Sequence, residues 1–271
     1  MSDKLPIYRI FRALLSWIYI LWYNPKIIGK ENIPTTGNYI IVGNHIHIYD
    51  QCNVIVSTKR YIRYMAKKEY FEGGLSWFFK GVGCIPVKRD HKDHDAVEKA
   101  IEVLNKNHCL GIFPEGTRNN LKKEKIKELT EKYYDDKPNS FKNTKKIKLS
   151  QINYLEDLYN SKIITEEDLK NNLSSPDEFL RQLVKEEKIS EENYYNSLLL
   201  PFKYGTVAIA NKTSSKIIPV AVTGDYKFRS KNLVVRIGRP FNIGSDLDVA
   251  NSKLRKEMLT LIEENLNNNG K

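Results

Sequence analysis

The sequence predicts an α/β fold: a mixed, partly parallel sheet flanked by helices, with an N-terminal interfacial helix and an inserted helical module. Short β-branched runs alternate with an amphipathic helical pattern, which indicates strands connected by helices. A stretch rich in Lys, Glu and Asn, with few strand signals, interrupts that alternation at residues 119–198. Hydrophobic residues make up 41% of the 271, enough for a core, which excludes a wholly disordered chain.

We expect three parts in the chain. Residues 1–30 form a membrane-interface helical segment, residues 31–118 and 199–271 form the α/β domain, and residues 119–198 form the inserted module. The formal net charge of +11 comes from the two ends, because residues 119–198 carry 15 basic and 16 acidic side chains. Such a basic body indicates an anionic partner, such as a membrane face, a phosphorylated substrate or nucleic acid.

The first expected helix covers Ile10–Tyr23, an apolar run too short to span a bilayer. A small-x-small cleavage site does not follow it, so it is not a convincing signal peptide. Lys4, Arg9 and Arg12 precede the uncharged part, and two tryptophans and two tyrosines lie within the run. Cations beside indole and phenol rings favour a helix in the headgroup region of a membrane. Packing as an ordinary core helix is the alternative.

The elements of the α/β domain follow from hydrophobic periodicity. β-branched or apolar runs predict strands, and apolar residues at i, i+3, i+4 and i+7 predict an amphipathic helix. Asp93 or Asp95 is the expected N-cap of that helix. The expected strands are residues 38–43, 61–66, 83–87, 109–113, 216–222 and 233–237, and the expected helices are residues 96–104 and 252–266.

The inserted module contains an internal repeat. Two leucines and an Ile-Thr-Glu-Glu-Asp segment at residues 155–168 recur 25 residues later as residues 180–193. Thr165 and Ser190 have the side chains of helix N-caps, and acidic residues follow each of them. We therefore expect two helix–turn–helix units. Residues 119–148 form either a helix or a mobile tether, and disorder is the alternative for the whole stretch.

The first chemical motif is Asn44-His45-Ile46-His47-Ile48-Tyr49-Asp50, directly after the first expected strand. A turn at a strand end can bring His45 and Asp50 together. A carboxylate on one imidazole nitrogen fixes the tautomer and stabilises the charge formed when the other nitrogen accepts a proton. A Gly-x-Ser-x-Gly motif is absent from the sequence, so the nucleophile could be a hydroxyl of the substrate. Without further motifs, most such His/Asp pairs have a structural role.

Three further segments lie at strand ends or within strands. Residues 113–118 (Phe-Pro-Glu-Gly-Thr-Arg) place a flexible glycine, a hydroxyl and a guanidinium together, which suits a phosphate. Residues 83–89 end in Lys-Arg at the same expected edge. Residues 217–222 are apolar and form only a wall or a core. The group at residues 90–95 has metal-ligand residue types, but we expect no metal site.

In this order, the four segments resemble the 1-acylglycerol-3-phosphate acyltransferase family of glycerolipid acyltransferases. Residues 44–50 match its N-H-x-x-x-x-D block and residues 113–118 its F-P-E-G-T-R block. Residues 83–89 and 218–220 resemble its second and fourth blocks. This chain differs from the family pattern by its insert at residues 119–198. In the family, a P-F-K-x-G segment, here residues 201–205, follows E-G-T-R closely.

The resemblance implies an enzyme of phospholipid biosynthesis that moves a fatty acyl group from a thioester to the free hydroxyl of 1-acylglycerol-3-phosphate, giving phosphatidic acid. The co-substrate is acyl-CoA or acyl carrier protein, and no other cofactor is expected. His45 is then the general base and Asp50 its orienting partner. The residues implied to bind the phosphate or glycerol are Arg89, Glu115, Gly116, Thr117 and Arg118, with Asn44, Lys68 and Lys88 in support.

The implied location is the cytoplasmic face of the membrane, as a peripheral or monotopic protein, with a lysophospholipid in an anionic membrane surface as partner and no nucleic acid. The blocks do not distinguish acceptors, so glycerol-3-phosphate, another lysophospholipid or an acylated amino-acid lipid stays open. A non-enzymatic basic module that binds membranes or nucleic acid is the other alternative, although recognisable nucleic-acid-binding signatures are lacking in the sequence.

Overall fold

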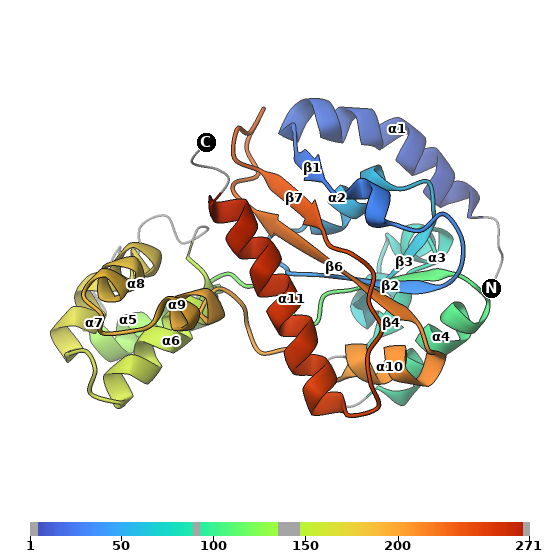
Figure 1. The fold of residues 1–271 in the computed structure, drawn as a ribbon. Helices are drawn as coiled ribbons and strands as arrows, with labels where there is room; N and C mark the ends of the chain where they lie inside the picture. Colours follow the sequence, from blue (N-terminus) through green and yellow to red (C-terminus); the bar gives the residue numbers. More distant parts are fainter. Residues whose placement is uncertain (1–4, 89–92, 135–146, 268–271) are drawn as a thin grey trace. The chain divides into compact units, whose positions relative to one another are not determined.

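The computed structural model describes residues 5–88, 93–134 and 147–267. The chain forms two compact units: residues 1–117 together with 202–271, and residues 118–201. The first unit is an α/β unit built on one sheet, and the second is made of helices (Figure 1). We call the second the inserted unit.

The α/β unit contains a seven-stranded sheet in the order β1-β7-β6-β2-β5-β3-β4. All neighbouring strands are parallel except β6 and β7, so the expected mixed sheet is confirmed. The strands are β1 (Lys26–Ile28), β2 (Tyr39–Gly43), β3 (Ile62–Lys67), β4 (Ile85–Val87), β5 (Cys109–Ile112), β6 (Lys216–Thr223) and β7 (Val234–Ile237). Only β1 was not expected, and the strand expected at residues 83–87 is shorter.

The carboxyl ends of the parallel strands meet at one edge of the sheet. In the register, Val42 of β2 pairs with Ile112 of β5 on one side and with Pro219 of β6 on the other. The loops that follow β2, β5 and β6 therefore begin side by side. Ligands of open α/β sheets bind beyond such carboxyl ends.

Helices cover both faces of the sheet (Figure 1). On one face α4 packs on β4 and β5, α11 packs on β6 and β7, and α10 contacts both helices. On the other face α1 contacts α2 and α3. Asp93 is the N-cap of α4, accepting a hydrogen bond from the Ala96 N–H. The bounds are α1 (Pro6–Tyr23), η1 (Lys30–Asn32), α2 (Asp50–Ser57), η2 (Lys68–Phe71), α3 (Ser76–Gly81), α4 (His94–Asn105), α10 (Gly205–Thr213) and α11 (Leu247–Asn267).

Helix α1 is apolar on its outer face. Tyr8 and Tyr19 are buried against the unit, whereas the large apolar residues on the other side are exposed. Across the described ranges, a helix long and apolar enough to cross a membrane is absent. The exposed large apolar residues of α1 are Ile10, Leu14, Leu15, Trp17, Ile18, Ile20, Leu21 and Trp22.

The inserted unit contains the expected repeat of helices. The Thr165 side chain caps α7, with Asp168 completing a capping box, and the Ser190 side chain caps α9. Lys162 and Glu187, also 25 residues apart, have φ near +58° where the chain leaves α6 and α8 (59° and 57°). Within residues 119–148 the structure has a helix, α5. The bounds are α5 (Lys123–Tyr133), α6 (Leu149–Asn160), α7 (Glu166–Asn172), α8 (Pro176–Lys185) and α9 (Glu191–Asn196).

Candidate active site

The structure brings His45 and Asp50 together. The loop after β2 leads directly into α2, whose first residue is Asp50, and the Nδ1 of His45 lies 2.8 Å from the Oδ2 of Asp50. The backbone N–H groups of Ile46 and His47 each donate to that same oxygen at 2.7 Å. The loop is thus folded around the carboxylate, which explains how a five-residue spacing places both side chains in contact.

The two partners differ in their exposure. The Asp50 side chain is fully buried, while the His45 side chain keeps 15% of its surface accessible. Because Asp50 occupies Nδ1, the neutral imidazole carries its proton there and keeps the Nε2 lone pair as an acceptor. The pair therefore has the arrangement of a general base held in one tautomer.

A stack of aromatic rings fixes the plane of the imidazole. The Phe113 ring, just past the end of β5, lies 4.1 Å from the His45 ring at an angle of 13°. The ring of Tyr64 on β3 also stacks with the Phe113 ring, at 5.7 Å. Gly111 makes room for this stack, because a Cβ there would lie 2.3 Å from the Tyr64 ring.

The Glu-Gly-Thr loop is tied to the His45 loop. The Glu115 side chain is buried and its Oε1 accepts a hydrogen bond of 2.8 Å from the His45 backbone N–H. Gly116 has φ of +70°, and the Lys203 side chain lies directly against it. The Lys203 backbone N–H also donates to the Pro114 carbonyl at 2.9 Å. Lys203 therefore contacts the loop that the sequence predicts to bind phosphate. The sequence motifs alone do not predict this contact.

Asn44 ties the start of the His45 loop to the neighbouring strand β6. Its side-chain amide donates to the Val222 carbonyl at 2.9 Å and accepts from the Val222 N–H at 2.8 Å. This pair of bonds continues the β2–β6 ladder beyond the end of β2. It fixes the residue immediately before His45.

Tyr226 is a further residue of the site, and local sequence patterns do not predict it. Its hydroxyl donates to the Oδ1 of Asp50 at 2.6 Å, so both carboxylate oxygens are occupied. Tyr226 lies three residues beyond the end of β6, whose apolar sequence by itself predicts only a wall or a core. The available signal was its position: β6 neighbours β2, so the loops after both strands begin at the same edge.

The nearby thiols are poor nucleophiles at neutral pH. Burial, with a further contribution from the charge of Asp50, raises the pKa of Cys52 to about 12. Burial raises the pKa of Cys84 to about 11. Since the thiolate is the reactive form, both side chains remain protonated and inert near pH 7.

The remaining expected site residues are placed separately. Arg89 lies outside the described residues. Thr117 is half-buried next to Gly116, and Arg118 is exposed and begins the inserted unit. Lys88 is exposed, and its backbone N–H donates to Asp93.

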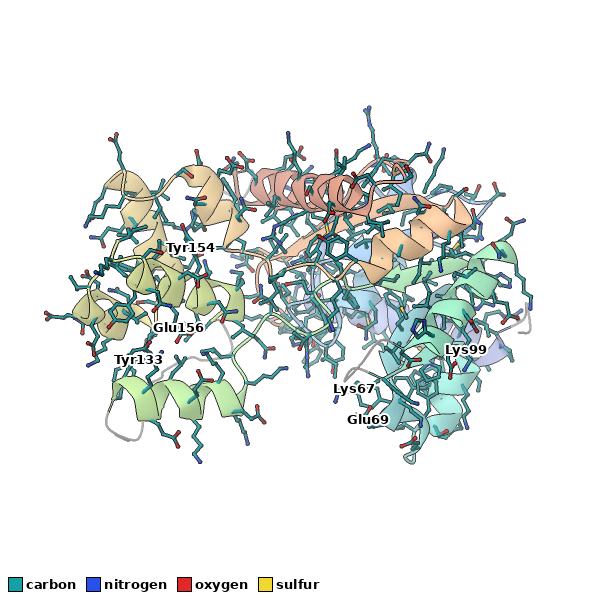
Figure 2. The ribbon with its side chains drawn as sticks, turned by 90° about the horizontal axis from the view of Figure 1, so that it is seen from below. Lys67, Glu69, Lys99, Tyr133, Tyr154 and Glu156 are labelled. Carbon is teal, nitrogen blue, oxygen red and sulfur yellow. The ribbon has the colours of Figure 1, made fainter. Side chains whose placement is uncertain are left out.

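Lys68 begins η2, directly after the carboxyl end of β3. It forms an ion pair of 3.3 Å with Glu72 and lines a hollow of about 450 Å³. Figure 2 labels Lys67 and Glu69, which come from the β3–η2 segment, and Lys99, which comes from α4. The hollow is lined by Lys68, Phe71, Glu72, Lys80, Cys84, Pro86 and Lys99.

Comparison with known proteins identifies a family. The acyltransferase family profile matches residues 24–223. A 1-acyl-sn-glycerol-3-phosphate acyltransferase of Bacillus subtilis (strain 168) is 32% identical over 113 residues, which are 41% of this chain and 57% of that protein. A protein of the same name from Borreliella burgdorferi is 33% identical over 96 residues, 34% of this chain and 38% of that protein. The aligned regions thus span less than two thirds of these relatives.

The fold has a solved counterpart. The crystal structure of the 1-acyl-sn-glycerophosphate (LPA) acyltransferase PlsC from Thermotoga maritima superposes with a TM-score of 0.55. The match covers 97% of this chain and 83% of that one at 18% identity. At this identity the likeness concerns the fold.

Proposed function

This chain belongs to the acyltransferase family, and from that premise we propose that it acylates the free hydroxyl of 1-acylglycerol-3-phosphate to give phosphatidic acid. Both relatives named above carry this activity in their names. The observation that carries the proposal is the His45–Asp50 pair, an imidazole held in one tautomer by a buried carboxylate at the edge where the parallel strands end.

The proposed reaction uses His45 as general base and then as general acid. The Nε2 of His45 takes the proton from the acceptor hydroxyl as its oxygen attacks the thioester carbonyl. The C–S bond breaks, and the imidazolium returns the proton to the leaving thiolate. Asp50 stabilises the positive charge on the imidazole while it exists. A positioned base of this kind contributes about 10²- to 10⁴-fold in rate.

We assign the acceptor's phosphate to the loop after β5. Gly116 and Thr117 offer backbone and hydroxyl donors, and Lys203 supplies a cation against that loop. Glu115 acts there through its hydrogen bond to the His45 backbone, which couples the phosphate loop to the base. Arg89 and Arg118 remain phosphate ligands proposed from the sequence.

We assign α1 to a membrane surface on the cytoplasmic side, where the lysophospholipid acceptor resides. Leu14, Trp17 and Leu21 are 58, 58 and 63% exposed on its outer face. A helix with such a face binds at the boundary between headgroups and acyl chains. Trp77 of α3 is also exposed and its ring contacts Phe11 of α1, so α3 extends the same apolar surface.

The test combines a substrate panel with one matched pair of variants. Purified protein is given vesicles that contain lysophosphatidate, lysophosphatidylcholine or an acylated amino-acid lipid, or soluble glycerol-3-phosphate, with acyl-CoA or acyl carrier protein thioester as donor. We expect the largest kcat/KM with lysophosphatidate, and His45→Ala should reduce kcat by at least about 10²-fold. His94→Ala, an exposed histidine at the start of α4, is the control that keeps full activity.

Three results would contradict the proposal or part of it. Near-normal turnover by folded His45→Ala would remove the base assignment. A preference for a different acceptor would keep the chemistry and move the protein to another acceptor class within the family. Salt-sensitive binding to nucleic acid, without transfer to any acceptor, would favour the non-enzymatic module.

A further inference from the structure

A chain of buried hydrogen bonds runs from helix α1 to the carboxylate that holds His45. The Tyr19 hydroxyl donates to the Oδ1 of Asn53 at 2.7 Å. The Nδ2 of Asn53 donates to the Tyr226 hydroxyl at 2.6 Å, and that hydroxyl donates to the Oδ1 of Asp50 at 2.6 Å. The chain joins side chains on α1, on α2 and on the loop after β6.

All its donors point toward the carboxylate. Because a carboxylate only accepts, Tyr226 must use its single proton on Asp50 and must accept from Asn53. The Asn53 amide is thereby oriented with its oxygen toward Tyr19, which donates. Hydrogen bonds aligned in one direction polarise one another, so the bond at the carboxylate depends on those behind it.

The links of the chain have little freedom to move. Asn53 is fully buried, and Tyr19 is 8% exposed. The Tyr226 ring is stacked on the His47 ring at 4.2 Å and meets the Tyr23 ring edge-on at 5.5 Å. Burial, followed by the charge of Asp50, raises the pKa of Tyr226 far above its usual value, so its hydroxyl remains a donor throughout the physiological range.

Helix α1 is the element with two roles in this arrangement. Its inner face contributes Tyr19 to the chain, and its outer face is the exposed apolar surface that we assign to the membrane. Polar contacts also seat α1 on the unit: the Ile62 N–H donates to the Tyr8 hydroxyl at 3.3 Å, and the Arg229 N–H donates to the Trp22 carbonyl at 2.6 Å.

We propose that Tyr226, Asn53 and Tyr19 are positioning residues through which the seating of α1 holds the Asp50–His45 pair in its working geometry. The inference rests on the proposed function of His45 as a base. The three residues touch neither substrate; they act through Asp50. Coverage of the outer face of α1 by lipid then favours the seated helix and, through the chain, the competent dyad.

The test replaces hydroxyls and keeps rings. Tyr226→Phe and Tyr19→Phe each remove one donor and preserve the aromatic packing. The matched control is Tyr194→Phe in the inserted unit, where a buried tyrosine also donates to a carboxylate, Asp177, at 3.0 Å. Measurements are kcat and KM on lysophosphatidate vesicles, vesicle flotation, thermal unfolding, and the pH dependence of kcat/KM.

We expect Tyr226→Phe to lower kcat roughly 10- to 100-fold, the range for a hydrogen bond to a charged group, with little change in acceptor KM. Without this donor the Asp50 charge is less dispersed and holds the imidazolium more strongly, so the acid limb of kcat/KM moves to higher pH. Tyr19→Phe should shift kcat and the acid limb in the same directions but by smaller amounts, and it should leave vesicle flotation unchanged.

The groups that face the dyad must be held constant in this comparison. Those around Asp50 include His45, Tyr226, Tyr19, Cys52 and Tyr64, and also His47, whose ring stacks on that of Tyr226. The Glu115 carboxylate binds the His45 backbone. The variants Tyr226→Phe and Tyr19→Phe each change one of these groups and keep the others.

Failure of this inference and failure of the proposed function give different results. If Tyr226→Phe and Tyr19→Phe lower only the unfolding temperature, as we expect of Tyr194→Phe, while kcat and the acid limb match wild type, the positioning chain is refuted. The His45 titration, followed by NMR and assigned with His45→Gln, reports the coupling without any substrate. A His45 pKa shifted in Tyr226→Phe supports the chain even if every acceptor in the panel proves inactive, and an unshifted one refutes it.

Discussion

Each unit of the molecule contains a carboxylate that accepts several hydrogen bonds, but the Asp50 side chain is fully buried whereas that of Asp177 is 40% exposed, and their partners differ. In the inserted unit, Asp177 accepts from the Gln151 amide at 2.6 Å, the Tyr194 hydroxyl at 3.0 Å and the Arg181 guanidinium at 3.0 Å. In the α/β unit, Asp50 accepts from a tyrosine hydroxyl, two backbone N–H groups and an imidazole. Arg181, the cationic partner of Asp177, is permanently charged, whereas His45, the imidazole partner of Asp50, can give up and regain a proton.

The setting of the two carboxylates differs in the same way. Asp177 lies in the first turn of α8 and links it to α6 and α9, so its bonds hold helices together. Asp50 lies at the edge where parallel strands end, and its histidine keeps an accessible face. Several hydrogen bonds to a carboxylate therefore do not by themselves identify it as catalytic. A catalytic role is indicated when the partner of the carboxylate is titratable and accessible, as His45 is at the edge where the parallel strands end.

The strongest way to break this comparison is to neutralise each carboxylate. Asp50→Asn should lower kcat by about 10²- to 10⁴-fold, because an amide cannot hold His45 in the required tautomer or stabilise its charge. Asp177→Asn should lower stability and leave kcat unchanged. Steady-state kinetics on lysophosphatidate vesicles, with circular dichroism to confirm folding, measure both.

The pair of results is decisive in either direction. Equal losses of kcat in the two folded variants would mean that both carboxylates act through stability alone. A folded Asp50→Asn protein with wild-type kcat would remove the catalytic role of the dyad.

A second test addresses the ring stack of the α/β unit, which depends on a glycine. All 14 glycines of the chain lie outside residues 119–198. In the inserted unit, the side chains of Thr165 and Ser190 cap helices α7 and α9. Gly111→Ala would place a methyl group against Tyr64, and overpacking of this kind costs about 1–3 kcal/mol. Because Tyr64 supports Phe113, kcat should fall too. Thermal unfolding and kinetics measure the two effects.

The matched control for Gly111→Ala is Gly205→Ala, since a Cβ at Gly205 meets nothing within 4 Å. It should leave both stability and kcat near wild type. A Gly111→Ala protein of normal stability and activity would show that the Tyr64 ring can move aside without disturbing the imidazole.

The sequence predicts local features of the site well and the long-range ones poorly. The His45–Asp50 contact follows from a five-residue spacing after a strand, and the caps at Thr165 and Ser190 follow from local side-chain chemistry. Tyr226 reaches Asp50 across 176 residues, and that contact depends on β6 lying next to β2. Hydrophobic periodicity predicts strands but not their order in the sheet.

The same limit explains the missed strand and the role of α1. β1 has only three residues, and it exists because β7 pairs with it at the edge of the sheet. The aromatic residues of α1 predict an amphiphilic helix, but which tyrosine points inward depends on α2, which supplies Asn53. Both features are set by the fold of distant segments.

A third test removes one side of the comparison. The Lys203 N–H bonds to the Pro114 carbonyl, so the ends of the insert lie close together and a short Gly/Ser linker can replace residues 119–200. Asn119 bonds to the Leu198 carbonyl, so the inserted unit also closes on itself at its base. We expect a folded α/β unit whose kcat stays within about 10-fold of wild type, with regulation or association altered first.

Circular dichroism, thermal unfolding and the vesicle assay measure that outcome. Excision of the same residues from His45→Ala is the control for background transfer. A folded but inactive excision variant would make the inserted unit part of the site and would end the division between a catalytic unit and a structural one.

The smallest effect concerns the response of the inserted unit to acid. Burial by itself raises the pKa of Asp177, but the charge of Lys148 and hydrogen bonds from Gln151 and Arg181 outweigh it and leave the pKa below its usual value. A carboxyl with a lowered folded pKa contributes stability above its unfolded pKa, about 3.9, and loses it as pH falls through the folded pKa. Helices α6, α8 and α9 should therefore lose protection below about pH 4.

Hydrogen exchange of peptides from these helices at pH 6 and pH 3 measures this loss, with the exposed Asp157→Asn as control. Asp177→Asn should be less protected than wild type at pH 6, and the difference should be smaller at pH 3, because protonation begins to remove in the wild type what the substitution removes at every pH. A constant difference between the two proteins at both pH values would mean that Asp177 supports the helices through packing. The two carboxylates would then differ in kind: the charge of Asp50 would matter to its unit, whereas Asp177 would support its helices without its charge.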